Sequence, residues 1–129
     1  TKGKAPLWEE CMRGISESKV TPVESQSPLF TGGMVTAQPL VSNALGSDFN
    51  FSIVNFSPGA KNLFHTHTSD QVLYVTRGKG IIATEQENVV ITVGDAAFIP
   101  SGERHWHGAT EDSYFSHITL TRRDSKTEF

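Results

Sequence analysis

The chain has 129 residues, of which 36% are hydrophobic and 19% charged, and a formal net charge of −3. The length and composition predict one globular domain. We expect it to be soluble, because no apolar run approaches the roughly 20 residues needed to cross a bilayer. The absence of a basic cluster argues against nucleic acid as a partner, and a lone cysteine without a signal-peptide pattern favours a cytoplasmic protein.

The N-terminal third of the sequence has the weakest secondary-structure pattern. Residues 1–25 are predicted to form an N-terminal arm, within which residues 7–15 are compatible with a short helix or an extended segment. Weak strands at 29–30 and 34–41, around a Gly-Gly pair, open the main domain, which we place at residues 26–122.

The remaining two thirds of the chain alternate short β-branched and aromatic runs with turn residues about every ten positions. Strands are predicted at 49–56, 71–76, 89–93, 96–99 and 114–121. Glycine and proline predict the turns between them, including one at residues 77–80 (Arg-Gly-Lys-Gly). The spacing predicts an all-β sandwich or barrel, followed by a polar tail at 123–129 that we expect to fray.

All five histidines fall in this strand-rich part of the chain. Residues two apart on a strand point to the same face, so His65 and His67 form one pair of imidazoles and His105 and His107 form another. His117 adds a fifth imidazole in the last strand. Unrelated surface or core histidines would not cluster in this way, and converging neutral imidazoles favour a transition metal ion.

Two spaced motifs around these histidines resemble those of the cupins. The first cupin motif joins a glycine, a His-x-His pair, an acidic ligand and a glycine, here matched by Gly59, His65, His67, Gln71 and Gly78. The second is matched by Gly94, Pro100, Gly102 and His105, with Ala109 in place of the usual asparagine. The resemblance implies a cupin domain, which is a jelly-roll barrel or double-stranded β-helix.

The glutamine in the first motif narrows the resemblance to small single-domain cupins that include manganese-dependent bacterial hydroxynitrile lyases. This likeness implies one divalent metal ion per chain, with manganese as the first choice and iron, nickel, cobalt or zinc as alternatives. The ligands that it implies are His65, His67, Gln71 and His105. It also implies that the two remaining histidines, His107 and His117, lie beside the substrate.

The chemistry of such a site follows from its charge. Neutral Gln71 cancels none of the ion's positive charge, so the centre should be a strong Lewis acid. We interpret His107 as a substrate contact or proton carrier, and His117 as a candidate base or a core histidine bonded to a backbone carbonyl. The residues expected to line an apolar interior around the ion are Phe51, Ile53, Leu63 and Leu73.

We therefore expect a metal-dependent enzyme that acts on a small molecule bearing carbonyl, hydroxyl or carboxylate groups, by lyase-type proton transfer with His107 or His117 as base. Two alternatives remain open: a metal-dependent dioxygenase and a non-catalytic module that binds a small ligand. The resemblance also implies a homodimer, in which the segment around Leu7 and Trp8 lies on the neighbouring subunit.

Overall fold

The computed structural model describes residues 12–129. Within these residues, two short 3-10 helices, Glu17–Lys19 and Asn43–Leu45, accompany a set of β-strands. In chain order these strands are β1 (Val23–Glu24), β2 (Phe30–Thr31), β3 (Val35–Val41), β4 (Phe49–Phe56), β5 (Lys61–Asn62), β6 (Thr66–His67), β7 (Gln71–Ala83), β8 (Asn88–Thr92), β9 (Ala96–Ile99), β10 (Trp106–Ala109), β11 (Phe115–Arg122) and β12 (Thr127–Glu128).

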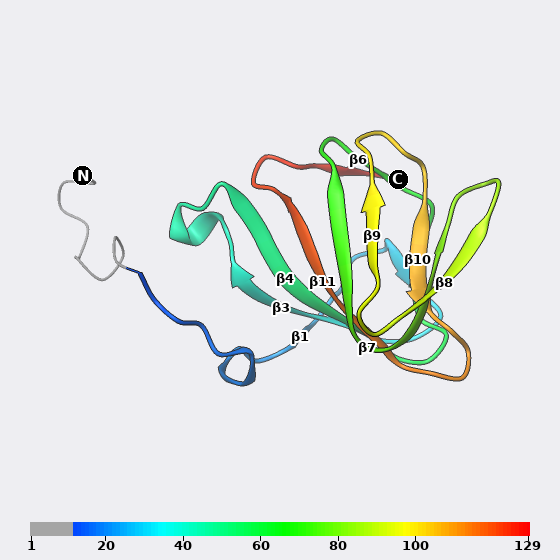
Figure 1. Cartoon of the computed structure of the whole chain (residues 1–129), viewed down its shortest axis with the longest axis horizontal. Helices are drawn as coiled ribbons and strands as arrows, with labels where there is room; N and C mark the ends of the chain where they lie inside the picture. Colours follow the sequence, from blue (N-terminus) through cyan, green and yellow to red (C-terminus); the bar gives the residue numbers. More distant parts are fainter. Residues whose placement is uncertain (1–11) are drawn as a thin grey trace.

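Ten of these strands form one sheet that curls into a half-barrel, and β6 and β12 pair separately as a two-stranded sheet (Figure 1). The hydrogen-bonded order of the larger sheet is β1-β3-β4-β11-β7-β10-β5-β2, with β8 and β9 also paired to β7, and all pairs are antiparallel. The predicted all-β class is confirmed. The strands predicted at 49–56 and 96–99 coincide with β4 and β9, and those near β3, β8 and β11 are offset by one residue.

The turn predicted at residues 77–80 is wrong, because β7 runs through it as one strand of 13 residues. Gly78 has a φ of +68°, and a Cβ at this position would overlap the carbonyl oxygen of Tyr114. The glycine therefore bends the strand instead of reversing it, beside a register shift between Ser116 and His117 of β11. The bend lets β7 pair with β11 and β9 in its first half and with β10 and β8 in its second, which wraps the sheet around its interior.

The interior of the curled sheet is filled by alternate residues of the strands. One cluster of buried apolar residues consists of Val35, Phe56, Ala60, Val75, Ile91, Ala109 and Phe115. A second, smaller cluster of Leu73, Ala97 and Ile99 lies between β7 and β9. Both clusters pack against Ile82, so the two halves of β7 share one apolar interior.

The expected lining of that interior is correct for Leu73 only. Val54 lies opposite the histidine of β11 on the inner face, so even-numbered residues of β4 point inward. Phe51 and Ile53 consequently lie on the outer face, where Ile53 is nevertheless buried, with 4% of its surface exposed. Leu63 is 43% exposed. The strand itself was placed correctly, but the choice of its inner face was wrong by one residue.

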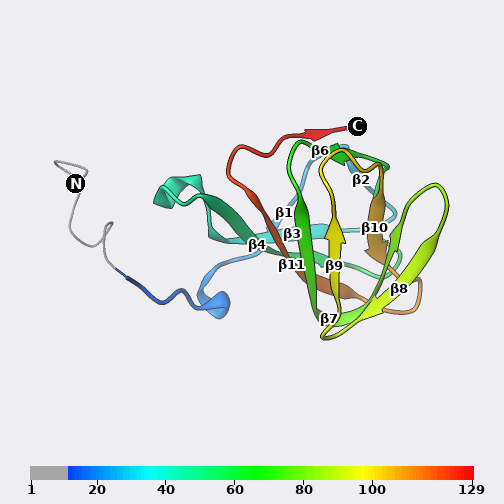
Figure 2. The ribbon, with the colours of Figure 1, turned by 45° about the horizontal axis from the view of Figure 1, so that its top comes forward.

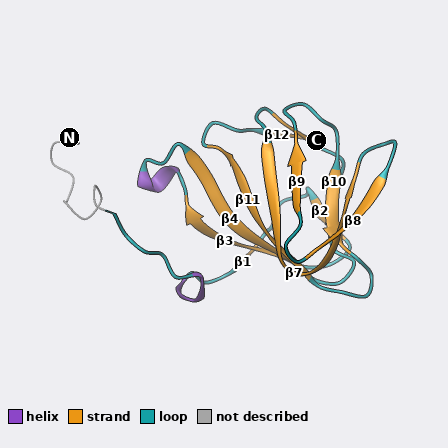
Figure 3. Ribbon diagram, in the orientation of Figure 1, coloured by secondary structure: helices purple, strands orange, loops and turns teal. Residues whose placement is uncertain are grey.

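The C-terminal end of the chain differs from the prediction, whereas the predicted N-terminal arm is only partly described. Leu7, Trp8 and the rest of residues 1–11 lie outside the described part of the chain, and residues 12–16 form no helix and extend away from the sheet (Figures 1 and 3). Residues 127–128 of the tail do not fray but pair as β12 with β6, at the rim seen in Figure 2. The domain boundaries after residues 25 and 122 stay predictions.

Within residues 12–129 there is no helix of the length and apolar character that a membrane span requires.

Candidate metal centre

Three of the predicted ligands meet where the chain segments before β6 and before β10 lie side by side. The N–H of His65 donates to the carbonyl oxygen of His105 at 2.9 Å, and the N–H of His105 donates back at 3.0 Å. This pairing sets the two imidazole centroids 4.3 Å apart, and the ring of His67 lies 4.8 and 5.4 Å from them. One ring nitrogen of each histidine lies within 4.8 Å of the other two, so the cluster can hold a metal ion.

Backbone carbonyl groups determine which nitrogen two of these rings present. The Nδ1 atom of His65 lies 2.7 Å from the oxygen of Leu63, and the Nδ1 atom of His105 lies 2.8 Å from the oxygen of Glu103. A carbonyl oxygen only accepts, so each Nδ1 carries the hydrogen and each Nε2 keeps a free lone pair. This is the arrangement in which histidines bind metals, with the outer N–H held by an acceptor.

His67 adds a buried ring nitrogen to the same region, and Gln71 adds an amide oxygen acceptor. The Nδ1 atom of His67 lies 3.0 Å from Oγ1 of Thr127, and the amide Nε2 of Gln71 donates to Oγ1 of Thr119 at 2.8 Å. The Nε2 atom of His67 and the Oε1 atom of Gln71 are then buried without a hydrogen-bond partner. Buried acceptors of this kind are costly unless a cation or donor meets them, so the residues present fit a divalent ion.

Burial keeps the three imidazoles in the form that binds metals. It lowers the pKa of His65 and of His67 from 6.5 to about 4, and it also lowers the pKa of His105. The charge that each protonated ring would carry repels the others, which lowers the pKa of His65 and His67 further. At neutral pH the cluster therefore consists of uncharged imidazoles.

A cavity of about 100 Å³ adjoins the cluster. Its apolar walls are Leu29, Phe30, Val54 and Phe56, and its polar lining comprises Asn62, His65, His67, Gln71, His107, His117 and Thr119. An apolar wall with a few converging polar groups is the usual character of a small-molecule site. The structure thus brings Gln71, His107 and His117 to the same cavity as two histidines of the cluster.

The tautomer of His107 is set by Asn62, which is 3% exposed. The Oδ1 atom of Asn62 accepts the backbone N–H of His107 at 2.8 Å, so its Nδ2 atom must face the ring Nε2 of His107, 3.2 Å away. An amide nitrogen only donates, so Nε2 of His107 accepts and Nδ1 carries the hydrogen. This Nδ1–H group is buried without a partner.

His117 presents a hydrogen-bond acceptor to the cavity, whereas His107 presents a donor. Its Nδ1 atom lies 3.1 Å from the carbonyl oxygen of Ile118, so Nδ1 carries the hydrogen and the buried, unpartnered Nε2 keeps its lone pair. The ring is 1% exposed, stacks on Phe56 at 5.6 Å and lies 4.9 Å from the ring of His107. Burial lowers its pKa to about 4 and that of His107 well below 6.5.

The comparisons with known proteins agree with this architecture. The sequence model of the cupin domain family matches residues 52–120. This chain belongs to the cupin family. The cupin is similar to an (R)-mandelonitrile lyase from Granulicella tundricola, with 39% identity over 71 residues, or 54% of each sequence. The match therefore spans about half the length of that curated relative.

Solved structures extend the likeness to most of the cupin. A cupin-like protein from Thermotoga maritima is 33% identical, covers 82% of both chains and has a TM-score of 0.76. The polyketide cyclase RemF from Streptomyces resistomycificus has a TM-score of 0.82, covering 92% of this chain and 84% of its own. RemF is 19% identical, so its likeness shows the fold alone.

Sequence reasoning missed the residues that orient the histidines and the glutamine of this cupin. Thr119 follows His117 by two residues and so shares its inner face, a spacing from which its place could have been inferred. Asn62 and Thr127 gave no such signal, because they reach their partners His107 and His67 across separations of 45 and 60 residues.

Proposed function

We propose that this cupin is a metal-dependent, lyase-type enzyme acting on a small organic molecule that bears a hydroxyl, carbonyl or carboxylate group. The observation that carries the proposal is the pair of buried histidines with opposite hydrogen-bonding character beside the metal-binding cluster. His107 offers an unpartnered N–H donor, and His117 offers an unpartnered nitrogen lone pair. Both side chains line the cavity of about 100 Å³.

The proposed ligands are His65, His67, Gln71 and His105, with manganese as the first ion to test. When bound, a divalent ion would supply positive charge that increases the acidity of a hydroxyl group beside it. The pKa of His117, about 4, leaves its Nε2 unprotonated at neutral pH, as a proton acceptor suited to such an acidic hydroxyl.

In the proposed cleavage, His117 acts as the base and His107 donates a hydrogen bond to the leaving group. The Nε2 atom of His117 takes the hydroxyl proton while the bond between the carbinol carbon and its leaving group breaks, and a carbonyl forms. The leaving group departs with the electron pair of that bond, and the Nδ1–H group of His107 donates a hydrogen bond to it. His117 then returns its proton to the leaving group, so the enzyme ends in its starting protonation state.

The volume of the cavity limits the size of the substrate group that it can enclose. A cavity of about 150 Å³ is known to hold benzene, so a cavity of about 100 Å³ encloses a group of a few non-hydrogen atoms. Hydroxynitriles are the first compounds to test, because the similar protein from Granulicella tundricola is named for mandelonitrile. The hydroxyl and nitrile groups suit the acceptor of His117 and the donor of His107.

The test is release of cyanide and carbonyl product from hydroxynitriles of increasing size, by protein loaded with Mn²⁺ and by protein stripped with a chelator. We expect turnover that requires the metal and does not require oxygen. His117→Gln should lower it by about 10²–10⁴-fold, the usual contribution of a general base. Turnover that depends on oxygen would instead support the dioxygenase alternative, and ligand binding without turnover would support the binding module.

We also propose that the cupin forms a homodimer through the outer face of its sheet. The side chains of a continuous cross-strand row on that face are all apolar: Val41, Phe51, Leu120, Val72 and Phe98. Phe98, at one end of this row, is 65% exposed. An apolar row across a sheet is self-complementary about a two-fold axis, which a second copy of the chain supplies.

Light scattering at micromolar concentration should therefore give twice the mass of one chain. Phe98→Asp should shift the mass towards the monomer, because it places a charge within the row. Val93→Asp is the matched control, since Val93 is 60% exposed but lies outside the row. A monomeric parent protein, or an equal effect of the two substitutions, would contradict the proposed interface.

A further inference from the structure

The outer nitrogen of His67 has a partner from a different part of the chain than those of the neighbouring histidines. The Nδ1 atoms of His65 and His105 bond to carbonyl groups only two residues away. The Nδ1 atom of His67 instead lies 3.0 Å from the hydroxyl oxygen of Thr127, which is 60 residues further along the chain. The orientation of this one predicted ligand therefore depends on the docking of the C-terminal strand β12.

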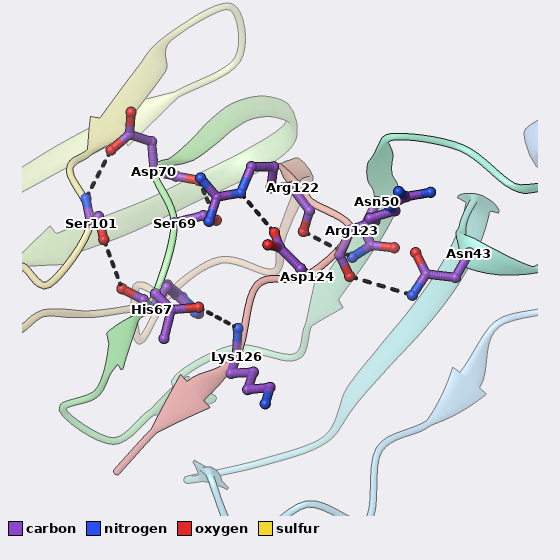
Figure 4. A network of polar contacts seen from close by, with 11 residues as sticks. Asn43, Asn50, His67, Ser69, Asp70, Ser101, Arg122, Arg123, Asp124 and Lys126 are labelled. Atoms are coloured by element: carbon purple, nitrogen blue, oxygen red, sulfur yellow. Dashed lines mark hydrogen bonds and ion pairs between the residues drawn. The ribbon is translucent and has the colours of Figure 1, made fainter.

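The docking of the C-terminal segment is specific. Thr127 pairs with His67 in the two-stranded sheet of β12 and β6. The backbone N–H of Thr68 donates to the carbonyl of Lys126 at 3.0 Å, and the N–H of Lys126 donates to Oγ1 of Thr68 at 2.8 Å. Figure 4 shows Lys126 of this segment alongside the strand that carries His67.

Hydrogen bonds also attach the beginning of the C-terminal segment to the main sheet, before the chain reaches β6. The side-chain amides of Asn50 and Asn43 donate to the carbonyls of Arg122 and Arg123, each at 3.3 Å (Figure 4). The N–H of Arg123 also donates to the carbonyl of Asp48 at 3.0 Å. These contacts bring residues 122–126 across the rim. Both residues of β12 are nevertheless exposed, and among residues 12–129 only β6 pairs with them, so this segment should open more readily than the core strands.

We infer that Thr127 is a positioning residue for the proposed metal ligand His67, and that metal binding and docking of β12 stabilise each other. This inference rests on the metal centre of the proposed function. A threonine hydroxyl can donate or accept, and in the role of acceptor for the Nδ1–H of His67 it holds the ring with Nε2 towards the cluster, which is what outer partners do for metal-bound histidines. By thermodynamic linkage, the factor by which a docked β12 strengthens metal binding equals the factor by which metal strengthens docking.

Two variants separate the hydroxyl of Thr127 from the packing of β12. Thr127→Val keeps the branched shape and the backbone pairing but removes the acceptor, whereas Thr127→Ser keeps the hydroxyl. We expect Thr127→Val to weaken binding of Zn²⁺ by about 10-fold to 100-fold, as loss of an outer partner usually does, and Thr127→Ser to bind like the parent. Glu128→Gln, a change in the adjacent exposed residue, is the control for charge and should also bind like the parent.

The measurements are competition titration of Zn²⁺ against a chelator and hydrogen exchange of the Thr68 amide, which reports docking through its bond to Lys126. Zn²⁺ should slow this exchange in the parent and slow it less in Thr127→Val. Unchanged Zn²⁺ affinity in Thr127→Val, or equal weakening by Thr127→Ser, would overturn the role of Thr127 while leaving the metal centre intact. A parent protein that binds no Zn²⁺ would overturn both.

Discussion

Replacing His105 with alanine should abolish binding of Mn²⁺ or Zn²⁺, whereas replacing His107 with alanine should leave about one ion bound per chain. The two histidines are well matched, because they lie two residues apart and are 2% and 4% exposed. The Nε2 atom of His105 is free and belongs to the cluster, so its loss removes a ligand. The Nε2 atom of His107 already accepts from Asn62, and its Nδ1 carries a hydrogen, so no lone pair remains for a metal.

Elemental analysis after dialysis measures occupancy, and thermal unfolding tests whether both variants are folded. In the same preparations, His107→Ala should lower turnover by about 10²–10³-fold, the usual effect of removing one hydrogen-bond donor from a developing negative charge. Loss of the ion from folded His107→Ala would make His107 a ligand. Full metal occupancy in His105→Ala would contradict the proposed metal centre.

The metal-free protein should lose stability steeply as the pH falls below 6.5. The pKa of His117 falls from 6.5 in the unfolded chain to about 4 in the folded one, and the pKa of His107 falls well below 6.5, in both cases because of burial. Between these values the unfolded state binds more protons, so protons favour unfolding. Each such group decreases the free energy of unfolding by up to about 1.4 kcal/mol per pH unit, against a total stability of about 5–15 kcal/mol.

Urea unfolding at a series of pH values, in the presence of a chelator, measures this slope. His117→Gln should reduce the slope over pH 6.5 to 4, because it removes one group that the unfolded chain protonates. His67→Gln is the comparison at a half-buried position, where solvent weakens the effect. Stability that stays constant from pH 7 to 5 in the metal-free parent would show that the histidines titrate alike in the folded and unfolded states.

Several features of this protein were determined by the sequence itself. The His-x-His spacing places His65 and His67 on one face wherever a strand forms, because side chains alternate with a period of two. The turn residues and short apolar runs gave the strands of the all-β fold to within one residue for β3, β4, β8, β9 and β11. These are local properties, and each depends on a few neighbouring residues.

Tertiary structure decided what depends on distant partners. The face of β4 that points inward follows from its pairing with β11, and the continuation of β7 through Gly78 follows from the strands that pair with it on either side of the bend. The nitrogen that each imidazole presents depends on its hydrogen-bond partner. Asn62 decides it for His107, and Thr127 contacts Nδ1 of His67, and both partners are far away in the sequence. Because a histidine can donate or accept at either nitrogen, the sequence determined where the imidazoles gather, and only the folded contacts decided what each of them can do.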